Sequence, residues 1–165
     1  MKNPDIIQVA QNFLAQNIPD YRCAFVAGSV MRGEGGPHSD IDLVVIVDEE
    51  NGPPPHRESL EMEGWPLEAF INNPRSARLI LQRDINRGSA AMIGMMKEGR
   101  PIGPDQALAD ELQALAQKVW DKGPPPLPPE DIAFRRYFIS DGVDDLRAFY
   151  ESDRKFISEF ARWRA

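Results

Sequence analysis

The stretch that most constrains the fold is residues 24–48, AFVAGSVMRGEGGPHSDIDLVVIVD. The apolar run Cys23–Ala27 predicts a buried strand, and Gly28-Ser29 predicts a tight turn where that strand ends. A glycine-rich loop follows, and a second strand is expected to open with Ser39–Asp42 and to continue through Leu43–Val47. The segment therefore predicts two apolar strands joined by a glycine-rich connection.

The second of these strands carries two acidic residues, Asp40 and Asp42, in an otherwise apolar context. Side chains alternate between the faces of an extended strand, so both carboxylates are expected on one face, roughly 6.6 Å apart along the strand. Two carboxylates held side by side repel each other unless a cation lies between them. The spacing therefore indicates a metal site.

The combined motif resembles the signature of the polymerase-β-like nucleotidyltransferase superfamily. It consists of Gly28-Ser29, Arg32-Gly33 and Ser39-Asp40-x-Asp42-Leu43, with the paired motifs at strand ends. Within the superfamily, residues 22–72 look most like the antibiotic (aminoglycoside) nucleotidyltransferases and the minimal nucleotidyltransferases of toxin–antitoxin pairs. The resemblance implies an α/β (α+β) fold: a small mixed β-sheet packed with helices, followed here by a C-terminal helical segment.

The resemblance also implies roles for individual residues. Asp40 and Asp42 would bind one or two Mg²⁺ ions, which neutralise the phosphates and steady the attacking and leaving oxygens of an in-line displacement. Gly28 would let the backbone approach the triphosphate, and Ser29 would offer a hydroxyl and an amide where anions bind well. Ser39 belongs to the same nucleotide-binding motif. Arg32 could contact a phosphate, although a solvated loop arginine explains it equally well.

A third acid is expected from a hairpin formed by Glu58–Glu63 and Pro66–Asn72 around Gly64. Glu68 interrupts an apolar strand and is costly to bury without a partner. In the superfamily a third carboxylate comes from the strand beside the Asp-x-Asp strand, and Glu68 matches that position. It would act as a third metal ligand or as the general base; an exposed strand glutamate is the alternative. A shifted register would bring Glu61 or Glu63 there instead.

Composition narrows the class of protein. The chain has 165 residues and a formal charge of −7, which argues against a nucleic-acid partner and would suit a cationic acceptor. The single cysteine, Cys23, excludes an internal disulfide and is expected to be a buried, reduced thiol. No apolar run reaches membrane-spanning length and no signal-peptide pattern opens the chain, so we expect a cytoplasmic protein without a membrane partner.

The remaining sequence predicts the domain organisation. A catalytic domain is expected over residues 1–121, a proline-rich linker over 122–129 (KGPPPLPP), and a C-terminal helical segment over 130–165. The helical segment is rich in aromatic residues and cannot bury them by itself. We therefore expect it to pack on the catalytic domain or on another subunit, which would make a homodimer.

The sequence leads to one main hypothesis and two alternatives. The main hypothesis is a Mg²⁺-dependent enzyme that transfers a nucleoside monophosphate, AMP from ATP in the first instance, to a hydroxyl of a small molecule and releases pyrophosphate. An aminoglycoside-like cationic compound would be a suitable acceptor. The first alternative is a minimal nucleotidyltransferase antitoxin that adenylylates a partner toxin protein. The second is a non-catalytic nucleotide-binding module.

Overall fold

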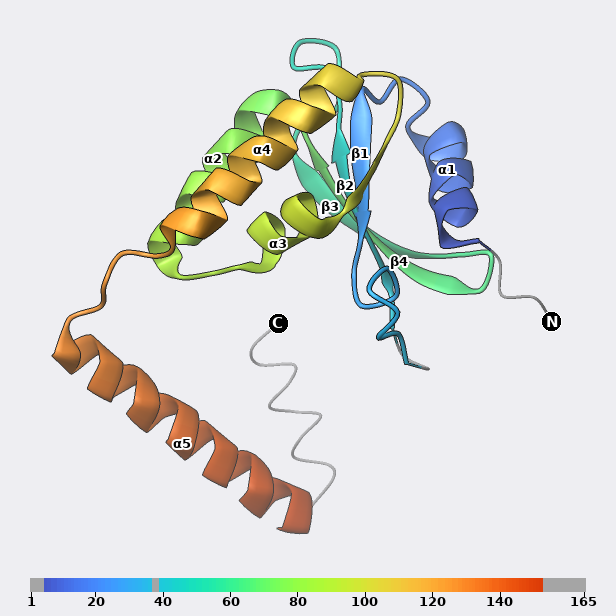
Figure 1. Ribbon diagram of the computed structural model, residues 1–165. Helices are drawn as coiled ribbons and strands as arrows, with labels where there is room; N and C mark the ends of the chain where they lie inside the picture. The colour runs from blue at the N-terminus through green and yellow to red at the C-terminus, as the bar shows by residue number, and fades with distance from the viewer. Residues whose placement is uncertain (1–4, 37–38, 153–165) are drawn as a thin grey trace. The chain divides into compact units, whose positions relative to one another are not determined.

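The computed structural model describes residues 5–36 and 39–152. Figure 1 shows helices on both faces of one sheet. In chain order the elements are α1 (Ile6–Asn17), β1 (Cys23–Ala27), β2 (Ile41–Ile46), β3 (His56–Met62), β4 (Trp65–Asn72), α2 (Pro74–Arg87), α3 (Ala91–Glu98), β5 (Arg100–Ile102), α4 (Gln106–Lys122) and α5 (Pro129–Ser152). The five strands lie in the order β3-β4-β2-β1-β5. Only β2 and β4 pair in parallel among the described strands, so the predicted α+β fold with a small mixed sheet is confirmed.

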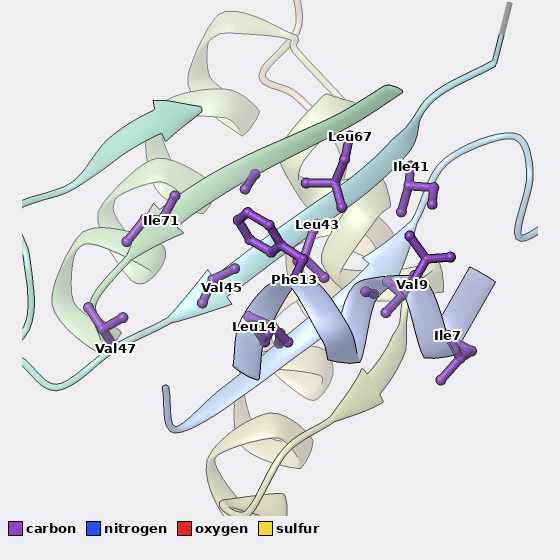
Figure 2. Packing of buried hydrophobic residues seen from close by; sticks show 14 residues of the cluster. Ile7, Val9, Phe13, Leu14, Ile41, Leu43, Val45, Val47, Leu67 and Ile71 are labelled. Atoms are coloured by element: carbon purple, nitrogen blue, oxygen red, sulfur yellow. The ribbon is translucent and has the colours of Figure 1, made fainter. Parts of the chain in front are cut away.

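One face of the sheet is covered by α1. Figure 2 shows Phe13 and Leu14 of this helix packed over Leu43, Val45 and Ile71 of the sheet. All five of these side chains are fully buried. Burying a side chain of this kind contributes about 1.5–3 kcal/mol, so this layer is a large share of what holds α1 in place.

The opposite face is covered by α2, α3 and α4 (Figure 1). Alternation along the strands turns Phe25 of β1 and Val44 of β2 towards these helices. They pack with Leu81 of α2, Met96 of α3 and Leu112 of α4, all of them fully buried. Because Asp42 lies two residues before Val44, its side chain lies on the same face, the one covered by α2, α3 and α4.

The start of β2 differs from the prediction by two residues. Asp40 precedes the strand, which begins at Ile41. The reason lies in the neighbouring strands: β1 ends by pairing Ala27 with Asp42, and the parallel pairing with β4 starts at Ile41 opposite Leu67. Beyond that point no described strand offers a partner, so Asp40 stays in the loop and is free to approach Asp42 from outside the sheet.

Two further details of the core were not expected from the sequence. The short edge strand β5 follows α3 and pairs with β1, with Pro101 opposite Phe25. The helix α4 begins at Gln106, because the Asp105 side chain accepts the Leu108 N–H at 3.0 Å and caps the helix. Asp105 also forms an ion pair with Arg22, which ties the start of α4 to the start of β1.

The chain divides into two units, Met1–Pro125 and Pro126–Ala165. The second contains α5, a single helix of 24 residues. Most of its large apolar side chains are described, and those are exposed; among them, Phe138 makes edge contacts with Phe134 and Tyr137. Residues 153–165, which include the aromatic residues Phe156, Phe160 and Trp163 of the predicted helical segment, lie outside the described residues. The predicted domain boundaries and the predicted dimer through this segment stay predictions.

Within the described part of the chain, no helix is long and apolar enough to cross a lipid bilayer.

Candidate active site

The turn after β1 is shaped by Gly28. Its φ of +97° is a conformation that L side chains rarely adopt, and a Cβ added there would lie 3.0 Å from Oδ2 of Asp42. From Ser29 onward the chain makes a short helical turn, in which the Met31 N–H donates to the Gly28 carbonyl and the Arg32 N–H to that of Ser29, both at 3.2 Å. The missing side chain thus lets the turn lie directly against the Asp42 carboxylate.

Ser39 connects the two ends of the glycine-rich loop. The Ser29 hydroxyl donates to Ser39 Oγ at 3.0 Å, and the Gly36 N–H donates to the same oxygen at 2.8 Å. With its oxygen accepting both hydrogen bonds, the Ser39 hydroxyl still has its own proton to donate. The loop therefore holds Ser29 and Ser39 together beside the first acidic residue of the site.

Three carboxylates meet at the start of β2. Asp42 and Glu68 are directly opposite each other in the parallel β2–β4 pair, so their side chains share the face that α2, α3 and α4 cover. Together with Asp40 they offer oxygens that all lie within 4.8 Å of one another. These are the three acidic residues that the sequence motifs predicted for the site. The register places Glu68 in the group, whereas Glu63 lies in the β3–β4 turn and accepts a hydrogen bond from Asn12.

Glu68 has protein partners on the neighbouring strand. Ser59 pairs with Glu68 across β3 and β4, and its hydroxyl donates to Oε1 at 3.2 Å. Arg57 donates from Nη2 to the same oxygen and lies with its guanidinium carbon 5.5 Å from the centroid of Phe70. Arg57 and Ser59 were missed from the sequence; their alternation in β3 opposite Glu68 and Phe70 could have suggested them once the hairpin register was assumed.

The electrostatics of the site are unfavourable for a bare carboxylate at Asp42. Its pKa is raised, first by burial and then by the negative charges of Asp40 and Glu68. The guanidinium groups of Arg57 and Arg32 act in the opposite direction and offset part of the effect. Such a half-buried cluster of like charges favours either a proton or a cation between the oxygens.

A cavity of about 370 Å³ opens beside the turn. Gly28, Ser29 and Arg32 line one part of it, and Asp42 is the one of the three carboxylates that borders it. Arg32 Nε donates to Glu34 at 2.8 Å, and Nη1 lies 3.8 Å from Glu98. About half of the Arg32 side chain is exposed, so the guanidinium is held at the cavity and remains accessible to an anion.

The donor set fits a hard divalent cation. Mg²⁺ is usually bound by one or two carboxylates together with waters and the phosphate oxygens of a substrate, and all three side chains here offer carboxylate oxygens. Asp40 and Asp42 would be its ligands, since neither appears in an ion pair among the described residues. The Glu68 carboxylate has a second oxygen, Oε2, that could join them.

These features agree with the comparisons with known proteins. Residues 11–97 match the family model of the nucleotidyltransferase domain. The chain therefore belongs to the nucleotidyltransferase domain family, and the resemblance drawn from its motifs is confirmed. The matched residues include the Gly28-Ser29 turn and all three acids.

Among solved structures, the chain is similar to a nucleotidyltransferase-like protein from Exiguobacterium sibiricum 255-15. The two are 12% identical, with a TM-score of 0.47. The similarity covers 67% of this chain and 38% of that one, so this chain corresponds to well under half of the length of that protein. No protein in the curated set matches.

Proposed function

We propose that this protein is a Mg²⁺-dependent nucleotidyltransferase. It would transfer a nucleoside monophosphate, AMP from ATP in the first instance, to a hydroxyl group of a small-molecule acceptor and release pyrophosphate. The observation that carries the proposal is the meeting of Asp40, Asp42 and Glu68 within 4.8 Å beside a glycine turn, in a chain of this family. One or two bound Mg²⁺ ions would neutralise charge on the phosphate oxygens at the reacting centre.

The residues of the Gly28–Ser39 segment are proposed to hold the triphosphate. Gly28 lets the turn lie directly against the Asp42 carboxylate, which brings the turn beside the proposed metal ligand, and the Ser39 hydroxyl has a proton to donate. The Arg32 guanidinium, at the border of the cavity, would pair with the outer phosphates that leave as pyrophosphate. Asp40 and Asp42 would be the ligands of the metal.

Glu68 is proposed to serve the acceptor or the metal. In the transfer, a new bond forms between the acceptor oxygen and the α-phosphorus, the bond from that phosphorus to the β-phosphate oxygen breaks, and the acceptor proton is lost. The Glu68 carboxylate lies within the cluster of three acids and accepts hydrogen bonds from Arg57 and Ser59, which hold it where it could either take that proton or bind a cation. A Glu68→Gln variant separates the two roles, because a base is needed for transfer but not for metal binding.

The acceptor is proposed to be a cationic small molecule, such as an aminoglycoside-like polyol. The support is the net charge of −7 and the acidic group at the reacting centre, which would attract a cation. Cytoplasmic location is part of the proposal, since that compartment supplies nucleoside triphosphates and keeps a thiol such as Cys23 reduced.

The test is pyrophosphate release from ATP, GTP, CTP and UTP in the presence of Mg²⁺, against a panel of aminoglycosides and other polyols. We expect release that requires one of these acceptors and that is lost in Asp40→Asn and Asp42→Asn. A protein acceptor labelled in place of every small molecule would favour the antitoxin alternative. Mg²⁺-independent nucleotide binding that persists in both variants, with no release, would contradict the proposed function.

A further inference from the structure

The cavity at the site has two chemically different ends. One end is formed by the turn after β1 and the start of β2, and it carries the polar side chains of Ser29, Arg32 and Asp42 beside the apolar Ala27 and Met31. The other is formed by apolar and small residues of α3 and its N-terminal flank, together with one aromatic side chain from α4. These residues are Ala90, Ala91, Gly94, Met95 and Trp120. A ligand that fills both ends therefore needs an anionic part and an apolar part.

The apolar end has the features of a slot for a flat ring. A Cβ added at Gly94 would meet no atom within 4 Å, so the absent side chain leaves open space on the cavity side of α3. Trp120 is 42% exposed and borders the same cavity. The Lys97 ammonium lies 4.5 Å from the centroid of the indole ring, a contact that restrains the ring.

The polar side chains of the cavity are few. Apart from the Trp120 indole, the described side chains that line it and carry polar groups are Ser29, Arg32, Asp42 and Glu98. The Glu98 carboxylate already has cations 3.8 Å away on Arg32 and 3.3 Å away on Lys97. The α3 side chains of the slot offer neither an amide nor a hydroxyl that could read the edge of a base.

We propose that Trp120 and the small-residue face of α3 form the nucleobase site, and that the base is recognised by stacking. This inference rests on the proposed function, because it assigns the substrate of the same site. A cavity of about 370 Å³ is within the usual range for small-molecule sites, and stacking on an indole accepts any base. Purine nucleotides should therefore bind better than pyrimidine nucleotides, with little distinction between adenine and guanine.

The test uses the full chain with Trp65→Phe and Trp163→Phe, which leaves Trp120 as the single tryptophan. Fluorescence titrations in Mg²⁺ compare ATP, GTP, CTP, UTP and inorganic tripolyphosphate. We expect the nucleotides to quench Trp120, with ATP and GTP within about threefold of each other and severalfold tighter than CTP and UTP, because larger rings stack over more area. Tripolyphosphate should compete with ATP without quenching, since it lacks a base.

Variants then locate the base, with binding measured by calorimetry. Trp120→Ala should raise the Kd for ATP about tenfold, Trp120→Phe should restore most of the affinity, and both should leave the Kd for tripolyphosphate unchanged. Gly94→Leu should also weaken ATP binding selectively, because its side chain would fill the slot, while leucine favours the helix. The matched control is Trp65→Phe, on β4 near the α1 face, which should bind ATP as the parent does.

The outcomes separate this inference from the proposed function. Unchanged ATP affinity in Trp120→Ala and Gly94→Leu, with Mg²⁺-dependent binding abolished in Asp42→Asn, would overturn the base site and leave the proposed function standing. Selective loss of ATP affinity in Trp120→Ala, together with Mg²⁺-independent binding that survives Asp42→Asn, would support the base site and contradict the metal-dependent function. A parent protein that binds no nucleotide would overturn both.

Discussion

The close approach of Gly28 to Asp42 predicts the effect of adding one methyl group at position 28. Gly28 has φ +97°, and a Cβ there would lie 3.0 Å from Asp42 Oδ2 and 3.3 Å from the Asp40 carbonyl oxygen. A left-handed backbone costs an L residue about 1–2 kcal/mol, whatever its surroundings. Gly28→Ala should therefore lose that stability and, in addition, displace the Asp42 carboxylate from the cluster of three acids.

A matched control separates the two effects. Gly64, in the β3–β4 turn, has φ +82°, but a Cβ there meets no atom within 4 Å. Gly64→Ala should carry a similar backbone cost of about 1–2 kcal/mol and leave the metal site intact. Any further effect seen only in Gly28→Ala then comes from the contact with Asp42.

Two assays measure the outcome. Urea unfolding in EDTA should show comparable losses of stability in the two variants, on the order of 1–2 kcal/mol. Titration with Mn²⁺, followed by the electron paramagnetic resonance of the free ion, should show metal affinity at least about tenfold weaker in Gly28→Ala, because ligand misplacement is costly, and parental affinity in Gly64→Ala. Equal metal affinity in both variants would refute the claim that the carboxylate needs the space left by glycine.

Three further predictions concern stability and reactivity. Asp42→Asn should melt a few degrees higher than the metal-free parent at neutral pH, because two carboxylates whose oxygens lie within 4.8 Å of each other repel by about 1 kcal/mol even at the dielectric constant of water. The pKa of Asp42 is higher in the folded protein than in the unfolded chain, so the parent loses stability as the pH rises from the unfolded-state pKa to the folded-state pKa. The advantage of the variant should therefore vanish at acid pH. A variant that melts at a lower temperature than the parent at neutral pH would contradict this. Gln113→Leu should destabilise the protein by about 1–2 kcal/mol in urea unfolding, because the Gln113 amide donates to carbonyls at the end of α3. The control variant Gln117→Leu loses only an exposed hydrogen bond to Asp121 and should change the stability little. Equal losses of stability in the two variants would argue against the role of the Gln113 amide. Cys23 is 1% exposed and its pKa is raised to about 12, mainly by burial, so iodoacetamide at pH 8 should modify it only after unfolding, and rapid labelling of the native protein would contradict its burial.

The sequence was most informative where spacing and alternation act together. The strand Cys23–Ala27 has the predicted bounds, and β4 shows the alternation typical of a strand, with Leu67, Ala69 and Ile71 buried beneath α1. The same alternation places the Glu68 side chain beside that of Asp42, because β2 and β4 pair in parallel with these two residues opposite each other. Local patterns of this kind can be read from one sequence because strand geometry fixes which side chains share a face.

Other features depend on contacts that sequence does not specify. The strand β5 is only three residues long and contains Pro101, so its pairing with β1 depends on where α3 places it. The Arg57 contact to Glu68 depends on the exact hairpin register. The cavity slot arises from Gly94 and Trp120, which lie on different helices and 26 positions apart in sequence. Long-range packing decides each of these.

The most direct test of the central claim is a crystal structure of the protein with Mn²⁺ and a non-hydrolysable ATP analogue. We expect anomalous density for one or two ions beside Asp40 and Asp42, with the phosphates against the Gly28-Ser29 turn. Manganese bound elsewhere, or an analogue whose phosphates lie away from that turn, would contradict the account.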